Sequence, residues 1–166
     1  MSSPVTVVAK GEREIVITRA FDAPRHLVFE AHTVPQLLRR WFTGPDGWAL
    51  TTCEIDLRAG GAYRYEWTHQ DGRIMGMGGT FREVDPPARL VSSELFDEDW
   101  TGGETINTTT FEEAAGRTTL TTTVLYASAQ ARDGALGSNM EAGIAASYAR
   151  LDALLAGAPI GEDVAQ

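Results

Sequence analysis

The sequence predicts an α+β fold in which an antiparallel sheet of about seven strands curls around one long C-terminal helix. Three observations support this prediction. Two short helical segments follow the first strand, a run of alternating strands and short turns fills the middle, and one long helical pattern comes last. Connections this short join antiparallel neighbours, because parallel strands need a long crossover.

The first strand is predicted at residues 14–21, EIVITRAF, where the side chains alternate between two faces. Pro24 suits the first turn of a helix that continues to about residue 33. A second short helix, PQLLRRWF at 35–42, ends before Gly44-Pro45. The two helices therefore form a small insert between the first strand and the rest of the sheet.

Six further strands are expected between this insert and the final helix. Asp71-Gly72 is a strong hairpin signal, and a Pro-Pro pair breaks the chain at 86–87. The six strands are predicted at residues 49–57, 62–69, 73–84, 89–96, 104–113 and 117–126.

The last helix is predicted at about 139–156, with Ser138 and Glu141 as a capping box and Gly157 at its end. Its large apolar side chains recur at helical spacing and must be buried against a partner. The sheet is the only predicted element large enough to serve. The apolar positions are Met140, Ile144, Tyr148, Leu151 and Leu155.

Length and composition favour one ordinary domain, expected at residues 13–157 between a loose leader at 1–12 and a tail at 158–166. The formal net charge of −9 argues against a nucleic-acid partner, whose phosphates need a basic surface. No apolar run is long enough to insert into a membrane, and no secretory signal is visible. With Cys53 as the single cysteine, these features predict a cytoplasmic protein without an internal disulfide.

The sequence carries no metal-binding or cofactor-binding motif. The three histidines do not form H-E-x-x-H, and the glycine-rich stretch at 76–79 lies in strand context without a following helix. We therefore expect no metal and no cofactor.

A possible internal cavity is indicated by aromatic, methionine and polar side chains on the predicted inner faces. The alternative for the aromatic stripe of Tyr63, Tyr65 and Trp67 is a solid core, and for the threonine-rich strands it is a solvated face. A register slip of one residue would exchange the two faces of a strand. The candidate cavity residues are Trp41, Trp48, Tyr63, Tyr65, Trp67, Met75, Met77, Phe81, Asn107, Thr109, Thr121, Met140, Ile144 and Tyr148.

No catalytic residue is assigned, and three weak candidates are Glu94, His32 and Tyr148. If Glu94 faces the concave side of the sheet, burial would raise its pKa and suit acid–base chemistry. The alternative is an ordinary exposed carboxylate on a strand.

The order of the motifs resembles the START-like (SRPBCC) superfamily, and within it the domain group named for the activator of the heat-shock protein ATPase. The resemblance spans residues 13–156 and implies the helix-grip fold, with a cavity between the sheet and the last helix. The family usually has Gly-Trp where this chain has Gly143-Ile144, which implies a larger pocket. The motifs are F-D-A-P-R at 21–25, P-x-L-L-x-x-W-F at 35–42, P-P-x-R-L-V at 86–91 and G-I-x-x-S-Y-x-R-L at 143–151.

The resemblance leaves three functions open: binding of a small, largely hydrophobic molecule, a cyclase, dehydratase or hydrolase-type enzyme using the same cavity, or a module that activates a chaperone ATPase. We favour ligand binding, since pockets of this kind are mostly apolar with a few polar groups. In such a fold Trp41 would point inward and Trp48 would line the rim. A homodimer is a reasonable expectation.

Overall fold

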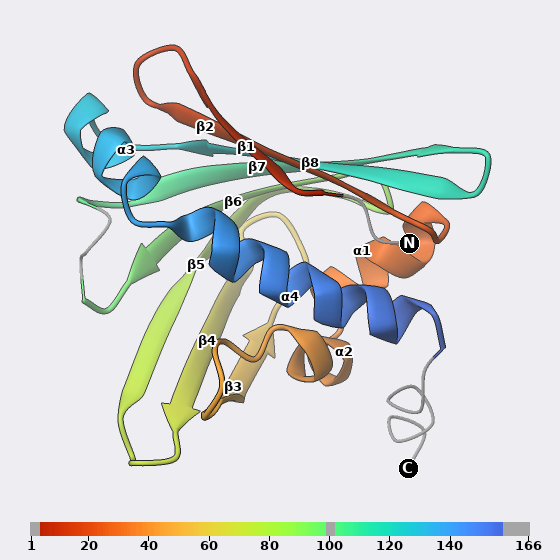
Figure 1. The fold of residues 1–166 in the computed structure, drawn as a ribbon, viewed down its shortest axis with the longest axis horizontal. Helices are drawn as coiled ribbons and strands as arrows, with labels where there is room; N and C mark the ends of the chain where they lie inside the picture. The colour runs from red at the N-terminus through yellow and green to blue at the C-terminus, as the bar shows by residue number, and fades with distance from the viewer. Residues whose placement is uncertain (1–3, 99–101, 158–166) are drawn as a thin grey trace.

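A computed structural model describes residues 4–98 and 102–157 of the chain (Figure 1). The expected tail at 158–166 lies outside the described residues, as do residues 1–3. The strands are β1 (Thr6–Lys10), β2 (Glu14–Phe21), β3 (Trp48–Ile55), β4 (Ala62–His69), β5 (Ile74–Asp85), β6 (Arg89–Phe96), β7 (Thr105–Ala114) and β8 (Arg117–Leu125). The helices are α1 (Arg25–Thr33), α2 (Pro35–Trp41), α3 (Ala129–Leu136) and α4 (Met140–Leu155).

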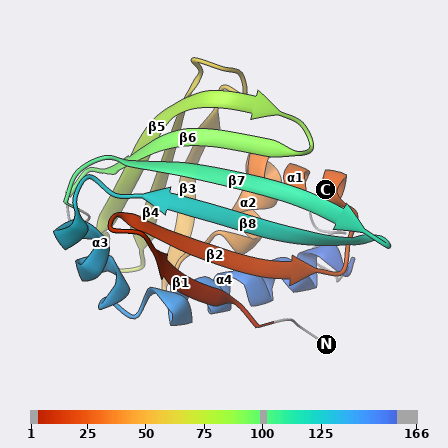
Figure 2. The ribbon, with the colours of Figure 1, turned by 90° about the horizontal axis from the view of Figure 1, so that it is seen from above.

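The described strands form one antiparallel sheet in the order β1-β2-β8-β7-β6-β5-β4-β3. The sheet curves strongly, and α1, α2 and α4 lie on its concave side, while Figure 2 looks onto the convex side. The α1–α2 insert carries the chain from β2 to β3 at the far edge, and a meander then returns it to β8 beside β2. The predicted α+β helix-grip architecture is therefore confirmed.

The sheet has one strand more than predicted, because β1 lies within the segment expected to be a loose leader. It pairs with β2 through contacts such as Val7 opposite Ile17, across a turn at Gly11, where φ is 57°. Most β1 side chains are exposed, so the strand shows little of the alternation that marks a half-buried strand. Main-chain pairing forms this edge strand where side-chain burial alone would not have indicated it.

The predicted capping box of the last helix does not form. Asn139 occupies the N-cap position with φ at 61°, and the Ser138 hydroxyl donates instead to the carbonyl of Ala135, 2.6 Å away. The physical reason is the additional helix α3, which ends directly before α4 and uses Ser138 to satisfy its last carbonyls. Ser128 caps α3 by accepting a hydrogen bond from the amide of Ala131.

Polar contacts attach the C-terminal half of α4 to its neighbours. Arg19 on β2 forms a two-pronged ion pair with Asp152, with N–O distances of 2.9 and 2.5 Å. Arg150 donates to the carbonyls of Trp41 and Gly44, in and just after α2. Leu151 is the only residue of α4 that is fully buried. Because the rest of its apolar stripe is only partly covered, α4 leaves space between itself and the sheet.

Candidate functional site

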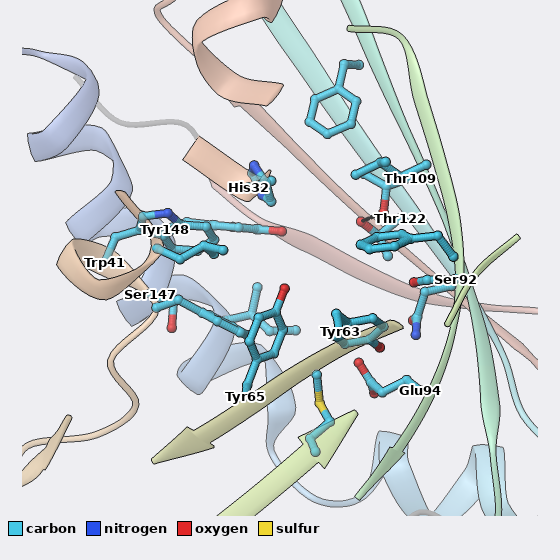
Figure 3. Close-up of a pocket in the computed structure, with 18 of the residues that line it drawn as sticks. His32, Trp41, Tyr63, Tyr65, Ser92, Glu94, Thr109, Thr122, Ser147 and Tyr148 are labelled. Carbon is cyan, nitrogen blue, oxygen red and sulfur yellow. Dashed lines mark hydrogen bonds between the residues drawn. The ribbon is translucent and has the colours of Figure 1, made fainter. Parts of the chain in front are cut away.

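A cavity of about 310 Å³ lies between the concave face of the sheet, the α1–α2 insert and α4 (Figure 3). The sheet contributes residues from β4, β5, β6, β7 and β8, so the space reaches under the long helix. Its volume falls in the lower range of small-molecule sites. The residues around it are His32, Leu38, Trp41, Phe42, Tyr63, Tyr65, Met77, Phe81, Leu90, Ser92, Glu94, Asn107, Thr109, Phe111, Thr122, Gly143, Ile144, Ser147 and Tyr148.

The structure brings most of the sequence-predicted site residues to this cavity. All three weak catalytic candidates, Glu94, His32 and Tyr148, line it. Aromatic side chains from two elements contribute: Trp41 from α2, and Tyr63 and Tyr65 from β4. The candidate ligand-binding residues found at the cavity are Trp41, Tyr63, Tyr65, Met77, Phe81, Asn107, Thr109, Ile144 and Tyr148.

Trp67 does not line the cavity, although it shares a strand face with Tyr63 and Tyr65. It is buried, and its indole N–H donates to the carbonyl of Phe42 at 2.9 Å. The Phe42 ring packs against both Trp67 and Tyr65 and itself lines the cavity. The loop after α2 therefore supplies the wall that Trp67 was expected to provide.

Trp48 and Met75 are not in the cavity lining; they line a second groove, which also includes Ile74 and Phe96. The Trp48 ring packs against His69, and the guanidinium of Arg73 lies 5.4 Å from its centre. The end of α2 therefore places Trp41 at the cavity, whereas Trp48, at the start of β3, lies farther along the same face of the sheet.

Thr121 and Met140 are also absent from the cavity lining. On β8 the inward positions are even-numbered, so Thr122 lines the cavity and its hydroxyl lies 3.2 Å from that of Thr109 on β7. Strand alternation then turns Thr121 toward the other face. Met140, at the start of α4, packs instead against a second apolar cluster around Ile15.

Sequence reasoning missed several lining residues whose signals were partly visible. Leu90 and Ser92 share a strand face with Glu94, so placing Glu94 inward implied them as well. Leu38 lies one helical turn before Trp41 in α2. The remaining missed residues are Phe42, Phe111, Thr122, Gly143 and Ser147.

Glu94 on β6 is the one carboxylate among the described residues that line the cavity. It lies opposite Thr105 in the β6–β7 pair and has a side-chain hydrogen bond with it, which acts to lower its pKa. Burial outweighs this contact and raises the pKa of Glu94 from 4.5 to about 7. At neutral pH the group is therefore close to its midpoint and can both hold and release a proton.

His32, on α1, lies on the other side of the cavity from Glu94 (Figure 3). Nδ1 lies 2.8 Å from the carbonyl oxygen of Val28, so it carries the proton and donates to that oxygen. Burial lowers the pKa of His32 to about 4, which leaves the ring neutral at physiological pH. The rings of Trp41 and Phe111 pack edge-on against it.

Among the described residues, three polar atoms on the aromatic side chains of the lining have no hydrogen-bond partner: Nε2 of His32 and the hydroxyls of Tyr65 and Tyr148. In the same part of the chain, no fully buried side-chain nitrogen or oxygen lacks a partner. These three atoms are therefore accessible, and the space beside them is the cavity that their residues line. Burial raises the pKa of Tyr148 to about 12, so its hydroxyl keeps its proton.

A family model described as activator of Hsp90 ATPase homolog 1-like protein matches residues 22–156. The matched region contains both short helices, β3 to β8 and α4. The chain belongs to this family. The match confirms the resemblance derived from the sequence motifs.

Several solved structures are similar to this chain. A protein from Rhodobacter sphaeroides is 34% identical over 93% of this chain and 99% of its own, with a TM-score of 0.88. Protein Ms6760 from Mycobacterium smegmatis is 30% identical over 92% and 97%, with a TM-score of 0.78. An AHSA1-like protein from Aeromonas hydrophila, at 21% identity over 86% and 94%, shares the fold with a TM-score of 0.62. No curated protein matches the chain.

The described part of this activator-like domain, residues 4–98 and 102–157, contains no group of three or more His, Cys, Asp or Glu side chains placed to hold a metal ion. Nor does any helix in those ranges combine the length and apolar character needed to cross a membrane. The side chains that line the cavity offer apolar contact, hydrogen-bonding groups and an ionisable carboxyl group at Glu94.

Proposed function

We propose that the protein binds a small, largely hydrophobic molecule in the cavity between the sheet and α4. The observation that carries this proposal is the set of polar atoms without partners at His32, Tyr65 and Tyr148, set among apolar walls. Polar atoms at a ligand site orient the ligand, while apolar surface supplies most of the binding free energy.

Closing the cavity tests the proposal. Ile144→Trp would place an indole in the space, whereas Ala149→Trp adds the same ring to an exposed position on the same helix. Native mass spectrometry of freshly purified protein should show a bound small molecule in the wild type and in Ala149→Trp, with loss from Ile144→Trp. Equal retention in both variants would mean that the molecule sits elsewhere.

An enzymatic role is the second candidate, and the position of Glu94 favours it. A carboxyl group with a pKa of about 7 inside a cavity suits a general acid or base in cyclase, dehydratase or hydrolase-type chemistry. Proton NMR would follow a co-purified molecule over time. Turnover that stops in Glu94→Gln while a neutral ligand stays bound would support this role, and a ligand unchanged by the wild type would contradict it.

The chaperone-directed alternative would use a surface outside the cavity. The second groove, at Trp48 and Met75, exposes Ile74, which is 64% accessible. Capture of a heat-shock ATPase by the wild type, lost in Ile74→Asp and kept in Ile144→Trp, would indicate this function and separate it from ligand binding.

A further inference from the structure

Glu94 has no cationic partner among the described residues. The cavity lining contains no lysine or arginine, and its one histidine is neutral. The arginines of β4, β5 and β6 pair elsewhere: Arg64 with Asp97 and Glu66, Arg82 with Glu104, and Arg89 with Glu83. A carboxylate placed in a largely apolar space without a counter-charge is costly, and a bound cation would relieve that cost.

Aromatic rings surround the same end of the cavity. The ring of Tyr63 lies 5.2 Å from that of Tyr65 and 5.3 Å from that of Phe81. Figure 3 shows the carboxyl group of Glu94 turned toward Tyr63 on the sheet side of the cavity. Burial raises the pKa of both tyrosines, and the Glu94 charge adds to that rise, which places the three groups within electrostatic reach of one another. Aromatic faces beside a carboxylate form an environment that attracts organic cations.

We propose that the ligand is an organic amine whose protonated nitrogen binds Glu94 beside Tyr63 and Tyr65. This inference rests on the proposed ligand-binding function. Its hydrocarbon part then lies against Trp41, Phe42 and Ile144, which close the cavity on the helix side. The amine hydrogens donate to the carboxylate, and the charged pair strengthens that contact. Carboxylate ligands are disfavoured, because nothing in the lining offers them a positive charge.

The test compares three probes that share one ring system: naphthylethylamine, naphthylethanol and naphthylacetate. Isothermal titration calorimetry measures their affinity, and amide chemical shifts of Gly143 and Ile144 report whether each probe occupies the cavity. We expect the amine to bind more tightly than the alcohol and the alcohol more tightly than the acid. In Glu94→Gln the amine should lose at least about tenfold in affinity, as for a lost charge-assisted hydrogen bond, while the alcohol changes little.

Glu112→Gln is the matched control. It removes one negative charge from an exposed position on β7, so it corrects for the general attraction of an amine to a protein with net charge −9. A loss of amine affinity in Glu112→Gln as large as that in Glu94→Gln would overturn the inference. Thermal melts check that both variants are folded. The comparison of the three probes on the wild type tests the inference even if a variant is unfolded.

The pH dependence gives a second readout. Between about pH 5.5 and 8.5 the amine stays protonated, and affinity should rise with pH until it levels off above the pKa of Glu94, about 7. Other groups near the carboxylate titrate outside this window, because the pKa values of Tyr63, Tyr65 and Tyr126 are raised and that of His32 is about 4. The alcohol should not show this rise.

The outcomes separate the two proposals. If the alcohol and the acid occupy the cavity as tightly as the amine, the amine inference is wrong while ligand binding stands. If none of the probes shifts the cavity amides, both the inference and the proposed function are contradicted.

Discussion

The two polar regions of the cavity, around Glu94 on β6 and around His32 on α1, respond to the same burial in different ways. Burial favours the neutral form of each group. It moves the pKa of Glu94 up to about 7 and that of His32 down to about 4. At physiological pH, Glu94 is therefore able to change its charge, whereas His32 is a fixed neutral ring held by the carbonyl of Val28.

This difference indicates separate roles. His32 lies among packed rings, with Trp41 and Phe111 at 4.9 and 5.6 Å, so that side of the cavity is part of the core. Glu94 faces the same cavity from β6, with a hydrogen bond to Thr105 and no cationic partner among the described residues. We expect the packing around His32 to contribute most to stability, its Nε2 to help orient a ligand, and Glu94 to determine which ligand charge is accepted.

The largest expected change in the free energy of unfolding is at the packed rings around His32. Phe111→Ala removes a ring that is 1% accessible and contacts Phe29 and His32, and it should lower the free energy of unfolding by about 3–5 kcal/mol. Urea unfolding measures the change, with the exposed neighbour Glu112→Ala as control. A loss of unfolding free energy below about 1 kcal/mol would mean that this region is not rigidly packed. The proposed difference between the His32 and Glu94 regions would then be wrong.

The next effect concerns Glu94. Its pKa is higher in the folded protein than the ordinary 4.5, so the folded state gains stability from the protonated group below that value and loses it as pH rises through about 7. The full difference corresponds to at most about 3 kcal/mol. Glu94→Gln should remove this decline, so its advantage over the wild type should grow between about pH 5 and 8 in urea unfolding. A pH-independent difference would show that Glu94 is not desolvated.

For His32, the contribution to the free energy of unfolding should change with pH in the opposite direction. Its folded pKa is lowered, so the stability associated with the neutral ring is present above 6.5 and is lost as pH falls toward 4. Between pH 6.5 and 5 the wild type should lose roughly 2 kcal/mol that His32→Phe does not lose. Unfolding curves for the two proteins at those pH values test the prediction. Parallel curves would indicate that the ring is protonated without cost.

The smallest effect is expected at Gly143, where α4 passes over the cavity. A methyl group added there meets no atom within 4 Å, so Gly143→Ala should gain helix propensity without a clash. We expect a stabilisation of about 1 kcal/mol, measured by thermal unfolding, with little change in probe binding. A destabilisation would mean that α4 approaches the sheet more closely than the cavity implies.

Much of the fold was predictable because it depends on local periodicity. The apolar spacing of Ile144, Tyr148 and Leu151 predicts the helix and the side it buries, and the hairpin signal at Asp71-Gly72 predicts an antiparallel meander. These patterns depend only on residues that are close together in the chain, so they can be recognised without the tertiary structure. Strand β1 and helix α3 were missed because β1 is mostly exposed and α3 has no fully buried residue, so neither carries a strong apolar pattern.

The sequence by itself determined the architecture and the inward helix stripe. Only the tertiary structure decided that Thr122 rather than Thr121 faces inward, that Phe42 rather than Trp67 forms the wall, and that Trp48 lines a second groove. The tertiary structure also decided that Glu94 is buried and that its pKa is raised. The reason is that strand register and burial arise from contacts between residues far apart in the chain, and a shift of one residue exchanges the two faces of a strand.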